Sequence, residues 1–129
     1  MANSKGSNYY IWIEAEQWLP GQWNPKDCNS DVIVSFEKSG EWVATFVTYD
    51  NVKTLANKNR HSGECLNGRY FWATDMILVD ELTRERIEEV VADLISTCEF
   101  EKVFSLGRIS NRRELRSAWN KLALSRLVS

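Results

Sequence analysis

The sequence is poor in the residues that mark catalysis, metal binding and disulfide scaffolds. Its 129 residues include one histidine, three cysteines and two prolines. The cysteines are odd in number and form no CxxC pair, which argues against a disulfide framework and against a structural zinc site. No glycine-rich phosphate loop, GxSxG elbow or HExxH pair is present. We therefore expect no cofactor, and the sequence argues against an enzyme of a common motif-bearing class.

Long hydrophobic runs are also missing. The apolar runs fall well short of the roughly 20 residues that a membrane-spanning helix needs. The first eight residues, MANSKGSN, lack the apolar core of a secretory signal and are interpreted as a frayed tail. Together with cysteines that show no disulfide pattern, this favours a cytoplasmic protein that does not enter a membrane.

What is present is typical of a globular domain. The chain is 43% hydrophobic and 26% charged, a balance that argues against wholesale disorder. Its length matches one domain, since single domains commonly have about 100–150 residues. We therefore interpret residues 1–129 as a single domain.

Charge is unevenly distributed along the chain. Residues 102–129 hold seven basic residues and one acidic residue, a net charge of +6. The preceding residues hold nine basic and seventeen acidic residues, a net charge of −8. This asymmetry has two interpretations. A basic C-terminal helix docks on an acidic body, or it forms a surface for an acidic partner or nucleic acid.

The first half of the chain reads as β-structure. Residues 9–18 alternate between apolar and polar side chains, as a half-buried strand does. Residues 31–50 predict a β-hairpin, because two alternating runs rich in valine, threonine and aromatics flank a turn at Lys38, Ser39 and Gly40. The loop between these segments contains both prolines.

A strand followed by a helix is predicted for residues 69–98. The strand is assigned to residues 69–81, and Thr83 is the expected N-cap of the helix. Leu82 and Ile87 have the spacing of a hydrophobic staple. The helix carries an apolar stripe at three- and four-residue spacing, which indicates an amphipathic helix with Cys98 as a small buried hydrophobe. The stripe consists of Ile87, Val90, Val91, Leu94, Ile95 and Cys98.

Three further segments complete the predicted fold. A short helix is expected at 51–58, capped by Asp50 or Asn51, and a loop at 59–68. Residues 103–104 form a last short strand or belong to a connector that ends at Gly107. Residues 110–127 predict a basic C-terminal helix. The fold class is therefore α+β, an antiparallel sheet of about four to five strands with two main helices packed on one face.

The densest polar cluster is the candidate for chemistry. It holds His61, Glu64 and Cys65 within five residues. A Cys/His nucleophilic pair requires the imidazole within hydrogen-bond reach of the sulfur. Metal binding through the same three residues lacks a convincing fourth ligand. A solvated polar loop is the competing and simpler interpretation, so these residues are weak candidates.

Six tryptophans suggest contact surfaces. Tryptophan is enriched at binding sites because it offers a large area and loses little rotamer entropy. Core packing is the interpretation for Trp42, Trp72 and Trp119. Trp18 and Trp23 flank a Pro-Gly turn, where full burial is hard to arrange, and are predicted to be exposed. With Glu14 and Glu16 on one face of the first strand, they form the predicted partner-binding site.

The basic helix offers a nucleic-acid alternative. Its basic side chains could follow phosphates, although a pI near 5.5 argues against a dedicated nucleic-acid binder. The residues concerned are Arg112, Arg113, Arg116 and Lys121.

No motif in the sequence is diagnostic of a known family. The functional hypothesis is a small cytoplasmic protein-binding module, such as an adaptor, an inhibitor or an immunity-type protein, without catalytic activity. An acidic body favours a basic protein partner, because complementary charge accelerates encounter. The alternatives are nucleic-acid binding through the C-terminal helix and a small enzyme that uses the His61/Cys65 loop.

Overall fold

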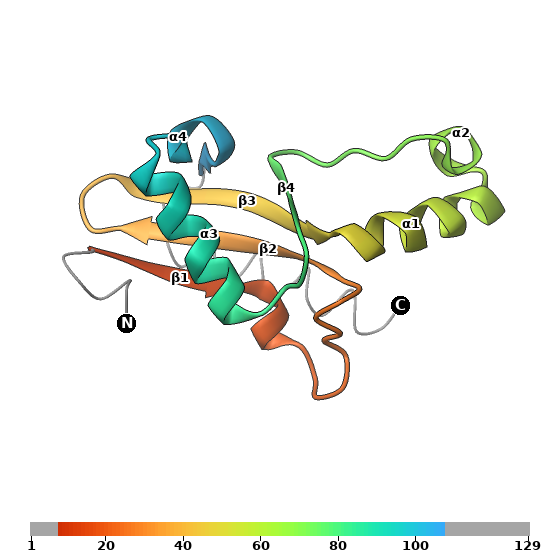
Figure 1. Ribbon diagram of the computed structural model, residues 1–129, viewed down its shortest axis with the longest axis horizontal. Helices are drawn as coiled ribbons and strands as arrows, with labels where there is room; N and C mark the ends of the chain where they lie inside the picture. Colours follow the sequence, from red (N-terminus) through yellow and green to blue (C-terminus); the bar gives the residue numbers. More distant parts are fainter. Residues whose placement is uncertain (1–7, 108–129) are drawn as a thin grey trace.

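The structure is a computed structural model, and it describes residues 8–107. The predicted helix at 110–127, and with it Trp119, lies outside these residues, as does nearly all of the predicted N-terminal tail. Within these residues, Figure 1 shows a sheet that is crossed on one face by a long helix. In chain order the elements are β1 (Tyr9–Ile13), η2 (Glu14–Gln17), β2 (Asn29–Phe36), β3 (Gly40–Thr48), α1 (Tyr49–Ser62), α2 (Glu64–Gly68), β4 (Met76–Val79), α3 (Arg84–Ser96), α4 (Phe100–Val103) and β5 (Ser105–Leu106).

The five-stranded sheet has the order β1-β2-β3-β4. Strand β5 also pairs with β3, at Trp42 and Val43, before the part of β3 that pairs with β4. The α+β class and the strand number are as predicted. All pairs are antiparallel except β3–β4, which is parallel, with Thr45 opposite Met76. The sheet is therefore mixed at this edge. Parallel neighbours need a crossover of a dozen or more residues, and residues 49–75 supply 27 between β3 and β4.

The predicted hairpin is confirmed as β2 and β3. Val34 pairs with Trp42 across it, and the chain turns back at Gly40, whose φ of +89° suits a residue without a side chain. The strand predicted for residues 9–18 is shorter than expected. It ends at Ile13, where the chain enters the 3₁₀ turn η2.

Helix α3 covers one face of the sheet, as expected (Figure 1). The Thr83 hydroxyl accepts a hydrogen bond from the Arg86 amide and so caps the helix. Leu82 and Ile87, the predicted staple pair, are both fully buried in the same core. The helix ends at Ser96, so the prediction for Cys98 is wrong: Cys98 lies beyond the last turn, exposed, with a φ of +62°.

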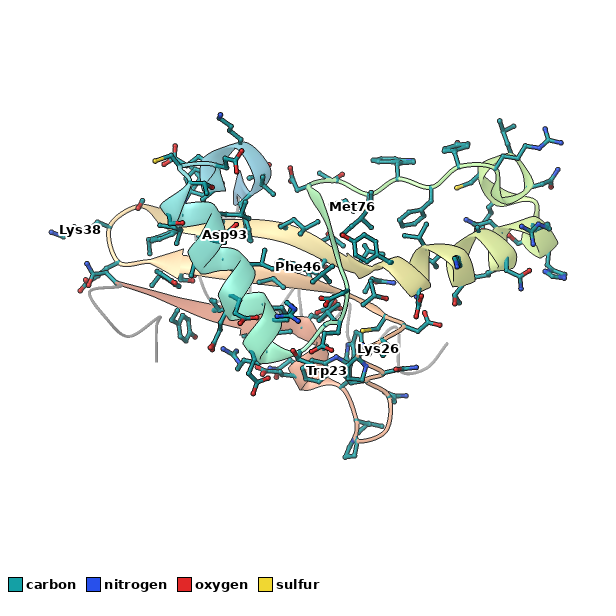
Figure 2. The ribbon with its side chains drawn as sticks, viewed as in Figure 1. Trp23, Lys26, Lys38, Phe46, Met76 and Asp93 are labelled. Atoms are coloured by element: carbon teal, nitrogen blue, oxygen red, sulfur yellow. The ribbon has the colours of Figure 1, made fainter. Side chains whose placement is uncertain are left out.

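A chain of aromatic rings joins the sheet to the C-terminal elements. Phe46, toward the C-terminal end of β3 (Figure 2), lies with its ring centroid 6.3 Å from that of Phe104. Phe104 stacks on Phe100 at 4.3 Å and 16°. These contacts hold α4 and β5 against the sheet. For this segment the sequence predicted either a short strand at residues 103–104 or a connector ending at Gly107. In the structure the strand is β5, at Ser105–Leu106.

Helix α1 is longer than the predicted 51–58 segment, and it runs on from the end of β3 beyond the sheet (Figure 1). Its cap is Thr48 rather than Asp50 or Asn51. The Thr48 hydroxyl accepts from the Asn51 amide and from the Cys28 amide, at 3.1 and 3.2 Å. The cap therefore also joins the helix to the loop before β2. In residues 8–107 no helix has the length and apolarity to cross a membrane.

Residues 64–75 differ most from the prediction. The segment expected to be a loop ends in α2, a left-handed turn in which Cys65, Leu66 and Asn67 have φ values of 52°, 53° and 60°. Residues 69–75 form no strand, and only Met76–Val79 pairs with β3.

Candidate functional site

The two carboxylates of the predicted partner site serve the fold. Glu14 is fully buried, and its carboxylate accepts a hydrogen bond from the Asp31 amide. Glu16 forms a bidentate ion pair with Arg84: its two carboxylate oxygens accept from Nε and Nη2 of Arg84 at 2.7 and 3.0 Å. This ion pair raises the pKa of the Arg84 guanidinium above its ordinary value. Arg84 also donates to the Ile11 carbonyl at 2.8 Å. The expectation of a shared strand face is wrong, because the chain leaves β1 before Glu14.

The two tryptophans of that site are half-buried rather than exposed. Both pack against the hydrophobic core. The indole N–H of Trp23 donates to the Leu82 carbonyl at 2.9 Å, just before α3. Trp23 thereby ties the 18–28 loop to the start of α3, and its role in partner binding stays a prediction.

The His61, Glu64 and Cys65 cluster is held by local hydrogen bonds. In the tautomer protonated at Nδ1, the His61 ring donates to the Asn57 carbonyl, 2.9 Å away. The Glu64 carboxylate accepts from the Ser62 hydroxyl at 2.8 Å. Within residues 8–107 no hydrogen bond joins His61 to Cys65, and no three His, Cys, Asp or Glu side chains are grouped so that they could hold a metal ion. The residues proposed for nucleic-acid binding, Arg112, Arg113, Arg116 and Lys121, lie outside the described part of the chain.

The three cysteines are expected to differ strongly in reactivity. Burial raises the pKa of the Cys28 thiol to about 11, and the neighbouring Asp27 carboxylate adds to this shift. Cys98 is exposed. With an alkylating probe at pH 8, Cys98 should react at least about 100-fold faster than Cys28, because the thiolate is the nucleophile. Peptide mass spectrometry over time measures both rates, and similar rates for the two thiols in the folded protein would contradict this expectation.

The same Cys28 shift gives a pH dependence of stability. The unfolded thiol ionises near pH 8.5, whereas the folded thiol stays neutral up to about 11. The contribution of Cys28 to the free energy of unfolding is thus complete below pH 8.5 and declines as pH rises through 11.

The alkylation experiment described for Cys28 and Cys98 also tests whether Cys65 is a catalytic nucleophile. Nucleophilic catalysis requires Cys65 to react faster than a model thiol.

Half of the large hydrophobic side chains that are exposed in residues 8–107 lie on one projection of the molecule. We call residues 49–75, which comprise α1, α2 and the connection to β4, the aromatic arm; Figure 1 shows it extending past the end of the sheet. Of the eight large hydrophobic side chains exposed in residues 8–107, four belong to the arm: Tyr49, Leu66, Tyr70 and Trp72. Trp72 is 66% exposed, so the prediction that it packs in the core is wrong.

The arm is anchored at its base. The Asp27 carboxylate accepts hydrogen bonds from the Asn51 amide group and the Thr54 hydroxyl, both at 2.7 Å. Asn51 in turn accepts from the Asn29 side chain at 2.8 Å. These contacts fix the first turns of α1 to the body, and at the other end of the arm the Asp75 carbonyl accepts a hydrogen bond from the Thr45 amide at 2.9 Å.

Charge separates the arm from the body. The arm holds four Lys or Arg and three Asp or Glu, a net charge of +1. The other residues between 8 and 107, which we call the body, hold five Lys or Arg and fourteen Asp or Glu, a net charge of −9. The arm is therefore nearly neutral and apolar, whereas the body is acidic.

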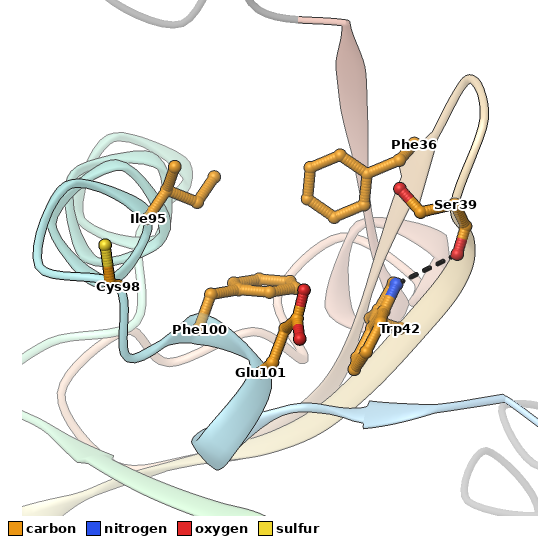
Figure 3. Close-up of a pocket in the computed structure, with 7 residues that line it drawn as sticks. All are labelled: Phe36, Ser39, Trp42, Ile95, Cys98, Phe100 and Glu101. Carbon is orange, nitrogen blue, oxygen red and sulfur yellow. Dashed lines mark hydrogen bonds between the residues drawn. The ribbon is translucent and has the colours of Figure 1, made fainter.

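A concave feature lies between the hairpin turn and α4. Figure 3 shows this pocket, which has a volume of about 410 Å³. Its described lining is mostly apolar: Phe36, Ser39, Trp42, Ile95, Cys98, Phe100 and Glu101. Sequence reasoning missed it, because its walls come from segments about 60 residues apart.

Comparison with known proteins adds no functional information: no protein-family model, curated protein or solved structure matches the chain significantly.

Proposed function

We propose that the protein is a protein-binding module that contacts its partner through the aromatic arm. The observation that carries the proposal is the exposure of Trp72 and Tyr70, 66% and 51%, on a segment that is hydrogen-bonded to the body at both of its ends. Exposed apolar surface costs free energy in water, and a concentration of it marks an interaction site more often than scattered residues do. Tryptophan and tyrosine are also the residue types that dominate binding energy at interfaces.

The body favours a basic partner. Its net charge of −9 creates a field that attracts positive proteins and repels acidic ones. The arm, with a charge near zero, supplies apolar contact without strong repulsion of either kind of partner. Together they suit a basic protein that presents an apolar recess for Trp72.

We place the protein in the cytoplasm. Cys28, Cys65 and Cys98 are all free. Cys98 is exposed, and a reducing compartment keeps such a thiol from forming mixed disulfides.

The test places a photoreactive amino acid at position 72 and, as a control, at position 89 on α3. A partner captured only from position 72 is purified, and its Kd is measured by calorimetry. Trp72→Ala should raise this Kd about 30-fold, the effect of a residue worth about 2 kcal/mol. Tyr10→Ala is the control, because Tyr10 is also an exposed aromatic residue (51%) but lies on β1, away from the arm.

Two outcomes would contradict the proposal. The first is a Kd that Trp72→Ala leaves unchanged. The second is capture of only a second copy of the chain, accompanied by dimerisation in sedimentation; the arm would then be a self-association surface.

A further inference from the structure

The pocket between the β2–β3 turn and α4 has walls of fixed aromatic rings. Phe100 is buried and rests on Phe104, with ring centroids 4.3 Å apart. Phe36 stands at 84° to Phe100 with a centroid separation of 5.3 Å, and Trp42 stands at 62° with 5.8 Å. Three rings that meet at steep angles can contact one compact group from several sides.

The polar group of Trp42 is already engaged. Its indole N–H donates to the Ser39 carbonyl at 3.2 Å (Figure 3), which orients the ring within the hairpin turn. Trp42 therefore contributes its aromatic surface, rather than a hydrogen-bond donor, to an occupant of the pocket. Ile95, from the last turn of α3, adds an aliphatic contact.

Glu101 is the one charged residue among the described residues that line the pocket. Its side chain is exposed and rises from α4 beside the Phe100 ring (Figure 3). A carboxylate at this position disfavours an anionic occupant and attracts a cation. Aromatic faces also attract cations, because the ring quadrupole is negative above and below the ring plane.

Among the charged residues next to the lining in sequence, acidic ones outnumber basic ones: Glu37, Glu41 and Glu99 against Lys38 and Lys102. Glu89 and Asp93 are exposed and follow α3 at four-residue spacing toward the pocket. Although Glu89 pairs with Arg86, the body as a whole remains strongly acidic. Its field raises the local concentration of positive ligands.

We propose that this pocket binds an ammonium or guanidinium group carried on an aliphatic chain, as in a lysine or arginine side chain. The three rings and Glu101 hold the cationic end, and Ile95 contacts the aliphatic stem. The volume of about 410 Å³ falls in the range of small-molecule sites and suits a side chain rather than a folded element. The site shares no residue with the aromatic arm, so it stands independently of the proposed function.

The experiment titrates the ¹⁵N-labelled protein with three short capped peptides that differ only in a central lysine, arginine or norleucine. The lysine and arginine peptides should shift the Trp42 indole N–H resonance saturably, and the norleucine peptide should bind more weakly. Titration with n-butylammonium identifies the source of the cation. If n-butylammonium binds more weakly than the peptides, the natural ligand is a side chain of a protein. If it binds equally well, the natural ligand is a free amine. Either result supports the site.

The variants separate charge recognition from folding. Glu101→Gln should weaken binding of the lysine peptide about fivefold, whereas Glu85→Gln, with the same charge change at the far end of α3, should leave it unchanged. Phe36→Leu removes one ring and should weaken binding about threefold. The proposal is overturned if no peptide gives a saturable shift, if norleucine binds as tightly as lysine, or if the two glutamine variants behave alike. Trp72→Ala should not alter any of these titrations, so failure here is distinct from failure of the aromatic-arm proposal.

Discussion

Replacing Phe46 with alanine is expected to lower the free energy of unfolding by about 3–5 kcal/mol, the typical cost of truncating a buried phenylalanine. Phe46 is completely buried in the second half of β3, and its ring contacts that of Phe104. The substitution removes apolar contacts and leaves a cavity between the sheet and α3. A domain of this size has a total stability of only about 5–15 kcal/mol, so the variant should unfold at much lower denaturant concentration.

Trp72→Ala is the control for this experiment. It removes a larger aromatic side chain, but one that is 66% exposed, and the expected change is within about 0.5 kcal/mol. Urea titrations followed by circular dichroism measure both variants. A loss below about 1 kcal/mol for Phe46→Ala would show that Phe46 is not part of a close-packed core.

Gly68→Ala is expected to release α2 from α1. Gly68 has a φ of +80°, and a Cβ atom added there would overlap the carbonyl oxygen of Ala56 and lie 3.1 Å from the Arg60 amide nitrogen. Both atoms belong to the backbone of α1 and cannot rotate away. The expected cost exceeds about 2 kcal/mol, since left-handed strain and a backbone clash add together.

Gly21→Ala is the matched control. Gly21 has a similar φ of +89°, but a Cβ atom there would meet nothing within 4 Å. This variant should cost about 1–2 kcal/mol, from backbone strain alone. Hydrogen exchange measures where the cost falls: Gly68→Ala should increase amide exchange in residues 56–68 while leaving β2 and β3 protected. Equal effects of the two variants would contradict the close approach at Gly68.

The elements that were predictable are those whose side-chain period matches a local burial pattern. The hairpin alternates, and its two strands are joined by a short turn, so partner and register follow from neighbouring sequence. Helix α3 carries both an apolar stripe and its own cap at Thr83, two local signals that agree with the tertiary packing. Its stripe buries Ile87 and Val91 against the sheet.

The strand assigned to residues 69–81 was mostly wrong for a physical reason. Tyr70, Phe71 and Trp72 favour strands because aromatic residues pack well on a pleated surface, yet only residues from Met76 onward reach a partner strand. Nothing local indicates where pairing begins. The left-handed turn at Cys65, Leu66 and Asn67 was equally invisible, since leucine and cysteine rarely adopt that conformation.

The pocket shows a different limit of sequence reasoning. Phe36 and Trp42 flank one turn, while Phe100 and Glu101 come from a helix of four residues about 60 positions later. Their meeting depends on β5 returning to pair with β3. A pattern confined to neighbouring residues contains no information on that return.

The crossover between β3 and β4 has a consequence for how such a molecule could diversify. The chain leaves the sheet after β3 and returns to it at β4, and the 27 residues of the aromatic arm between these strands project away from the body. The entropy of closing a loop grows only with the logarithm of its length, so doubling the excursion would cost about 0.6 kcal/mol. Insertions, deletions and new side chains in the arm should therefore change the stability of the sheet little. The hairpin, α3 and the aromatic core would then keep their packing while the projecting segment changes in length or sequence.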